Sequence, residues 1–161
     1  MEGSIGMTTP PESNIRNTIC SNMQRMVLTT GIAEDSAISI DDMKIRRCRG
    51  CAKCMYESPG NCILEDHFSP RIPELLSCEE LTIRSTVDDH WFSMPMRKVV
   101  ERIGNILEAW TDSGHNVPRD DSEISLRNIV IVTTGPADSM FESSSKEVLE
   151  KGPVKISFVY E

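Results

Sequence analysis

Asn128-Ile-Val-Ile-Val-Thr-Thr134 is the stretch of this chain that decides its fold. Every residue after the asparagine is β-branched, and branched side chains favour the extended backbone of a strand. The apolar run leaves no polar face, which is typical of a central strand in a parallel sheet that is covered on both sides. Gly135 and Pro136 follow and end the run. The stretch therefore predicts a buried central strand.

The clearest helical pattern of the chain lies before this strand, between Pro95 and Trp110. Its apolar residues recur at intervals of three and four, which places them along one face of an α-helix. They are Met96, Val99, Val100, Ile103, Ile106, Leu107 and Trp110. Pro95 is tolerated in the first turn of a helix, where its missing N–H leaves no hydrogen bond unmade. An amphipathic helix is expected here.

The remaining segments alternate between helical and extended patterns. We expect helices over residues 13–31, 69–78 and 143–151, and strands over residues 37–40, 80–86 and 154–160. In the last of these strands Lys155 and Ser157 alternate with apolar residues, which suits an edge position. Alternating strands and helices predict βαβ units, a parallel sheet and one α/β domain over residues 1–161.

Length, composition and charge narrow the class of protein. The chain has 161 residues, 39% of them hydrophobic and 26% charged, as in ordinary globular proteins. A net charge of -8 disfavours binding to nucleic acid, which is also negatively charged. No apolar run approaches the roughly 20 residues of a membrane span, and the N-terminus lacks the pattern of a signal peptide. We therefore expect a cytoplasmic protein, in which cysteines are more often ligands or reactive thiols than disulfides.

Four cysteines crowd the loop of residues 46–66: Cys48, Cys51, Cys54 and Cys62. Soft thiolates select zinc, cuprous copper and iron–sulfur clusters. Three of the cysteines recur every third residue with the fourth close behind, as in the ferredoxin-type arrangement around a 4Fe–4S cluster. Structural zinc more often uses two separated Cys-x2-Cys pairs. The spacing favours a cluster, with zinc and unliganded, redox-active thiols as the alternatives.

Several further short motifs occur in a definite order. In chain order they are Gly3-Ser4 with Ser13-Asn14, the cysteine motif with Gly50 and Gly60, Asp66, Ser85-Thr86-Val87-Asp88, Met96-Arg97 with Glu101-Arg102, and Thr133-Thr134-Gly135. This order resembles that of the flavodoxin-like NAD(P)H-dependent FMN reductases and of their subgroup, the iron–sulfur flavoproteins. Thr86 and Asp88 stand where that family has proline and tyrosine. Only Met1-Glu2 precede Gly3, so the first strand is expected to be truncated.

The resemblance implies a flavodoxin-like, three-layer αβα fold that carries FMN and a 4Fe–4S cluster. Cys48, Cys51, Cys54 and Cys62 would be the cluster ligands. The residues expected to contact the flavin are Gly3, Ser4, Ser13, Asn14, Ser85, Thr86, Val87, Asp88, Trp91, Thr133, Thr134 and Gly135. Trp91 is included because it follows the third strand, at the sheet edge where α/β proteins bind ligands.

The resemblance also implies a function, the transfer of electrons between the cluster and FMN by an oxidoreductase. A ferredoxin-like donor or NAD(P)H would supply the electrons, and a homodimer or homotetramer is expected. Two alternatives stay open. One is an NAD(P)H-dependent FMN reductase without a cluster. The other is a non-catalytic relative in which the cysteines hold a structural zinc or nothing.

Overall fold

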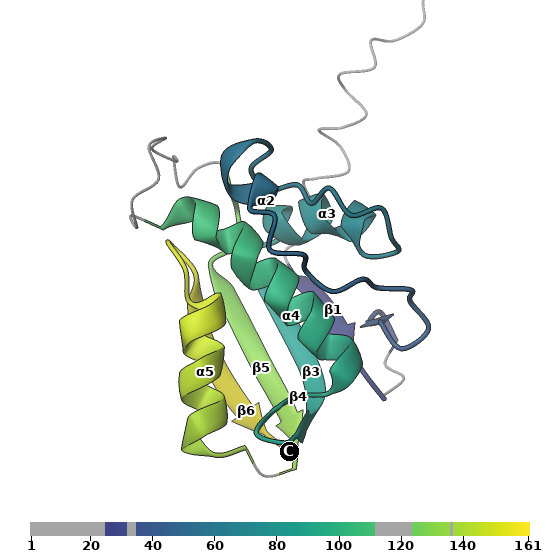
Figure 1. Cartoon of the computed structure of the whole chain (residues 1–161). Coiled ribbons are helices and arrows are strands. Elements are labelled where there is room, and N and C mark those ends of the chain that lie inside the picture. The colour runs from purple at the N-terminus through teal and green to yellow at the C-terminus, as the bar shows by residue number, and fades with distance from the viewer. Residues whose placement is uncertain (1–24, 32–34, 112–123, 136) are drawn as a thin grey trace, which may run out of the picture.

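The structure is a computed structural model that describes residues 25–31, 35–111, 124–135 and 137–161 (Figure 1). Its strands are β1 (Arg25–Thr29), β2 (Ile38–Ser39), β3 (Glu80–Asp88), β4 (Trp91–Phe92), β5 (Asn128–Thr134) and β6 (Lys155–Tyr160). Its helices are α2 (Lys53–Tyr56), α3 (Ile72–Ser77), α4 (Met94–Leu107) and α5 (Ser139–Leu149), with 3-10 turns η1 (Ser69–Arg71) and η2 (Glu108–Trp110). Five strands form a parallel sheet in the order β2-β1-β3-β5-β6, and β4 pairs antiparallel with the end of β3.

The predicted α/β class and parallel sheet are confirmed, and the arrangement is consistent with a three-layer α/β fold. Strand β5 has the bounds that its β-branched run predicts, and it lies between β3 and β6. Strand β6 is the edge strand that its alternating pattern indicates. Helix α4 starts with Pro95 in its first turn and buries the predicted apolar face. The residue patterns of these elements therefore determine their place in the fold.

One prediction is wrong. The helix expected over residues 13–31 cannot extend through Arg25–Thr29, because these residues form strand β1 beside β3. From Arg25 to Leu28 less buried and buried residues alternate, so the period here is two rather than 3.6. Gly31, at a φ of +73°, ends a strand and not a helix. The sheet thus includes β1, a strand beside β3 that was not expected. The truncated first strand expected at Met1-Glu2 lies outside the described residues.

The core lies between the sheet and the helices that cross it. Leu28, Ile83, Ile131 and Phe158 are in register across four neighbouring strands, and the first three are completely buried. Figure 1 shows α4 and α5 lying side by side across one face of the sheet. In the part of the chain that the structure describes, no helix is both long and apolar enough to cross a membrane.

Candidate functional site

The four cysteines of the loop all line one cavity of about 50 Å³. Cys54 belongs to the short helix α2, and its thiol donates to the main-chain carbonyl of Asn105 on α4 at 3.8 Å. Cys51 is exposed, Cys48 and Cys62 are partly exposed, and all four are free thiols. The four cysteines therefore line a single space beside α4.

Local backbone geometry explains how consecutive cysteines face the same space. Gly50 and Ala52 both have left-handed φ values, +66° and +57°, so the chain reverses twice within the motif. Such alternation turns main-chain N–H groups inward, a geometry that recurs at anion and iron–sulfur sites. The N–H of Gly50 donates to the sulfur of Cys48 at 3.4 Å. The loop thus presents both thiols and N–H donors that would stabilise charged sulfur.

The thiols also influence one another. Burial, together with the nearby thiols of Cys62, Cys48 and Cys51, raises the pKa of Cys54 to about 11. A thiol with this pKa holds its proton at neutral pH. Binding of a soft cation would release that proton, because only the thiolate is a metal ligand. A positively charged group in the cavity would therefore stabilise the thiolate form of these cysteines.

Zinc and a 4Fe–4S cluster require different arrangements of four thiolates. A single zinc ion needs four sulfur atoms about 2.3 Å from one point. Across residues 25–31, 35–111, 124–135 and 137–161, no group of three His, Cys, Asp or Glu side chains is placed so that it could hold a metal ion. A 4Fe–4S cluster instead takes one thiolate on each iron, so its ligands surround a larger object. Four soft thiols around one largely apolar cavity fit that chemistry.

The two ends of the cysteine loop meet at Asp66. One carboxylate oxygen accepts the main-chain N–H of Arg46 at 2.8 Å and the Arg102 guanidinium at 2.6 Å. The other accepts the N–H groups of Phe68 and Ser69. Burial alone would raise the pKa of Asp66, but the N–H groups of Arg46 and Ser69 and the charge of Arg102 lower it overall. Asp66 is therefore a buried carboxylate that closes the loop onto α4.

A second polar cluster lies at the opposite end of α4, where the parallel strands finish. The hydroxyl groups of Thr30, Ser85 and Ser93 are within hydrogen-bonding distance of one another, at 3.0–3.5 Å. Thr30 follows β1, Ser85 belongs to β3, and Ser93 is the N-cap residue of α4. Within the sheet, β2 lies on one side of β1 and β3 lies on the other, so the order of the strands reverses at β1. The cluster sits at this reversal of strand order, the point where α/β sheets bind ligands.

Thr133 extends this row of hydroxyls onto a third strand. It is in register with Ser85 on the neighbouring strand β5. Its side chain is fully buried, and its hydroxyl has no hydrogen-bond partner among the described residues. A buried polar group without a partner is uncommon and destabilising. We call Thr30, Ser85, Ser93 and Thr133 the hydroxyl row.

The residues expected to contact FMN lie in several parts of the chain, and their contact with FMN stays a prediction. Gly3, Ser4, Ser13 and Asn14 lie outside the described residues. Ser85 and Thr133 belong to the hydroxyl row. Thr86, Val87 and Asp88 are not a loop, because β3 continues to Asp88, so alternate side chains point to opposite faces of the sheet. Thr134 is the last residue of β5, and Gly135 follows it with a φ of +104°.

Trp91 is held by aromatic neighbours. Its ring packs edge-on against Phe92 and Phe141, with ring centres 5.0 and 6.1 Å apart. Trp91 lies on β4, which returns beside β3 through a tight turn at Asp89 and His90. His90 pairs with Asp138, the N-cap of α5, at 2.5 Å. A contact between Trp91 and flavin stays a prediction.

Sequence reasoning missed Thr30, Ser93 and the pairing of Asp66 with Arg102. The sequence did contain a pattern that indicates Thr30, because Thr-Thr-Gly occurs at 29–31 and again at 133–135. Each copy follows two apolar residues and marks the carboxyl end of a parallel strand. Ser93 carried no comparable signal, since only the folded turn after β3 brings it beside Ser85.

No protein-family model, no curated protein and no solved structure matches this chain. The cysteine cavity and the hydroxyl row are therefore the observations on which a function must rest.

Proposed function

We propose that this protein is a redox flavoprotein that holds a 4Fe–4S cluster in the cysteine cavity and FMN at the hydroxyl row. The observation that carries the proposal is the convergence of Cys48, Cys51, Cys54 and Cys62 on one cavity. When bound, the cluster would exchange single electrons and FMN would hold one or two, which couples a one-electron donor to a two-electron acceptor. The protein's own part is to bind, separate and shield the two groups.

The cavity supports a cluster through its surroundings as well as its thiols. Met55, Ile63 and Leu64 line it with apolar surface, which reduces its contact with water. Arg49 also lines it and would offset the negative charge of thiolates on a cluster. Solvent exposure, charge and hydrogen bonds to sulfur all tune the potential of such a group. The chain would thus set the potential with Arg49 and with the Gly50 N–H that donates to Cys48.

The hydroxyl row supports a polar ligand such as FMN at the carboxyl edge. Hydroxyl and main-chain donors position the polar edges of a flavin, and Thr133 offers one that no described residue uses. The first turn of α4 follows Ser93 and directs N–H groups to the same edge, where a helix start favours an anion. Ser85 and Thr133 were expected flavin contacts on the family resemblance, and Thr30 and Ser93 join them here.

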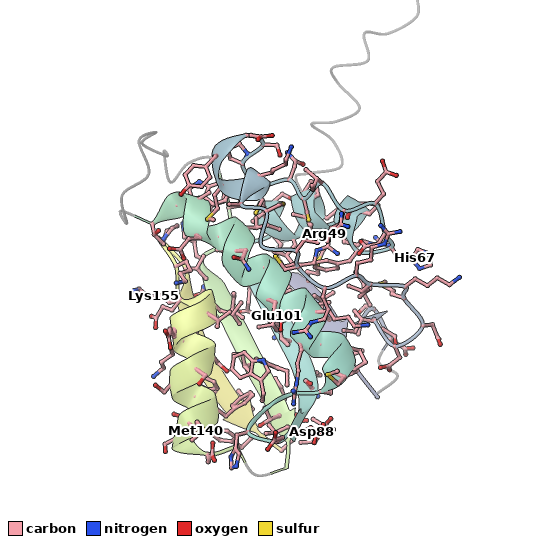
Figure 2. The ribbon with its side chains drawn as sticks, viewed as in Figure 1. Arg49, His67, Asp88, Glu101, Met140 and Lys155 are labelled. Atoms are coloured by element: carbon pink, nitrogen blue, oxygen red, sulfur yellow. The ribbon has the colours of Figure 1, made fainter. Side chains whose placement is uncertain are left out.

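The distance between the two sites bears on assembly. Asn105 lines the cysteine cavity and Ser93, the N-cap of α4, belongs to the hydroxyl row, so the two residues are 12 positions apart along the helix. At 1.5 Å a residue this is about 18 Å along the helix. In Figure 2, Arg49 of the cysteine loop and Asp88 at the end of β3 lie toward opposite ends of the molecule. We propose a homodimer or homotetramer in which the cavity of one copy faces the hydroxyl row of another.

The proposal includes partners and a compartment. A ferredoxin-like protein or NAD(P)H would reduce the protein, and the net charge of -8 gives no reason to expect nucleic acid. Free thiols persist in a reducing compartment, which favours the cytoplasm.

Cofactor analysis of protein purified without oxygen tests the proposal. We expect about four irons, four sulfides and one FMN per chain, with a visible absorption shoulder that dithionite bleaches. Flavin without iron would identify a cluster-free FMN reductase. Zinc, or no metal and no flavin, would identify the non-catalytic alternative. Either of these results would overturn the cluster assignment.

A further inference from the structure

We infer that Asp66, held by Arg102, is a positioning residue that keeps the four cysteines directed at one cavity. The inference rests on the proposed function only in that the four thiols are taken to share one ligand. It concerns residues that contact no thiol. Their influence would pass through the ends of the loop of residues 46–66.

The Asp66 carboxylate joins three parts of the chain that are distant in sequence. Arg46 leads into the cysteine loop, Ser69 starts the turn after it, and Arg102 lies on α4. Just outside these contacts, Lys44 and His67 also exchange hydrogen bonds between the two sides of the loop. The cysteines are thus carried on a closed loop whose base is one carboxylate.

The pair between Asp66 and Arg102 is fully enclosed. The two side chains are 2% and 1% exposed, and Arg102 also donates to the Ser69 hydroxyl at 2.8 Å. The guanidinium lies over the ring of Phe68, 5.2 Å from its centre. An enclosed pair with this many hydrogen bonds allows little movement, because breaking one contact leaves a charge buried without its partner.

Helix α4 transmits this rigidity to the cavity. Arg102 lies one turn before Asn105, whose carbonyl accepts the Cys54 thiol and which lines the cavity. The same helix therefore anchors the base of the loop and forms a wall of the space that the thiols face. Replacing a group that hydrogen-bonds directly to a metal ligand typically changes metal affinity about 10–100-fold, and a residue that acts through the ends of the loop is expected at the lower end of that range.

Asp66→Asn is the informative substitution because it keeps the shape and removes the charge. Both carboxylate oxygens accept N–H groups, so whichever position the amide nitrogen takes, it faces donors. The double variant Asp66→Asn/Arg102→Met also removes the uncompensated guanidinium. We expect the double variant to regain thermal stability but not the arrangement of the loop. Glu101→Gln, which breaks only the surface pair with Arg47, is the matched control.

Dibromobimane, which fluoresces strongly once two nearby thiols have displaced both of its bromides, reports convergence without iron. On metal-free, reduced protein we expect bridging to be about tenfold slower in Asp66→Asn and in the folded double variant, but not in Glu101→Gln. Iron uptake in anaerobic reconstitution should fall in parallel. Bridging at the wild-type rate in the folded double variant would overturn the inference. If wild-type protein takes up no iron while the variants still lose bridging, the proposed function fails and this inference stands.

Discussion

The cysteine cavity and the hydroxyl row lie at opposite ends of α4, and the chain builds them differently. All four thiols come from the single stretch of residues 48–62, which one carboxylate closes on itself. The hydroxyl row draws Ser85 and Thr133 from two strands, Thr30 from the residue after β1 and Ser93 from a helix cap. A change in the loop should therefore affect the cavity alone. A change in the packing of the sheet should affect the row first.

The largest effect is expected for Cys51→Ser. Cys51 is exposed, so its loss should leave the fold intact while removing one ligand from the cavity. The affinity of the cavity for iron should fall by more than the about 10–100-fold expected when an outer-shell partner is replaced, and iron per chain should fall with it. FMN content should stay constant. Cys78→Ala is the control, because Cys78 is buried away from the cavity. Equal iron content in wild type and Cys51→Ser would contradict the assignment of Cys51 as a ligand in the cavity.

Gly104→Ala tests whether the two ends of α4 can be separated. An added Cβ at Gly104 would lie 2.7 Å from the main-chain oxygen and a methyl carbon of Val148 on α5. Because the oxygen belongs to the backbone, the helices must move apart, at a cost of about 1–3 kcal/mol in the free energy of unfolding. Urea denaturation should show this loss.

The same variant should lose iron before FMN, because Gly104 directly precedes Asn105, which lines the cysteine cavity. Val148 also shares a surface pocket with Met55 of the cysteine loop, whereas the hydroxyl row lies at the other end of α4. Lys98→Ala, in the same helix, serves as the control. Loss of FMN with retention of iron would contradict the assignment of the sites.

Thr133→Val tests the hydroxyl row, because it should raise the stability of the protein and lower its affinity for FMN. Valine keeps the shape of threonine and removes a buried hydroxyl that has no partner among the described residues. The free energy of unfolding of the flavin-free protein should rise by about 1 kcal/mol, while FMN affinity falls. Thr82→Val should not be stabilising, because Thr82 accepts a hydrogen bond from Arg25 at 3.4 Å. A Thr133→Val protein that binds FMN as tightly as wild type would remove Thr133 from the site.

The smallest effect is expected at the rim of the carboxyl edge. The N–H of Phe141, followed by the His90 side chain, lowers the pKa of Asp138 below 3.8. A lowered pKa contributes stability above pH 3.8, and this is lost as the pH falls through the lower, folded-state value. Asp138→Asn keeps a good helix cap but cannot titrate. Its melting temperature should therefore fall less steeply than that of wild type below about pH 4. Parallel curves would show that Asp138 has no such role.

Local sequence patterns predicted the elements in which the buried residues follow a regular spacing within one segment. The β-branched run of β5 and the apolar face of α4 each contain their own period, so no distant contact was needed to identify them. The convergence of the thiols was predictable for the same reason, because the cysteines are neighbours in sequence.

Strand β1 and the hydroxyl row depend on contacts between distant residues. Met26 follows Ile15, Ile19 and Met23 at helical spacing, yet pairing with β3 determines that residues 25–29 are extended. Tertiary contacts override local propensity in this way when a segment is short. Ser93 reaches Ser85 only because β4 folds back on β3. No pattern along the chain encodes that approach.

Electron paramagnetic resonance of anaerobically purified, dithionite-reduced protein tests the central claim most directly. The account predicts the signal of one reduced cluster per chain in wild type and in Cys78→Ala, and its disappearance in Cys51→Ser. Reduced wild-type protein that gives no such signal, and whose thiols carry zinc or no metal, would contradict it.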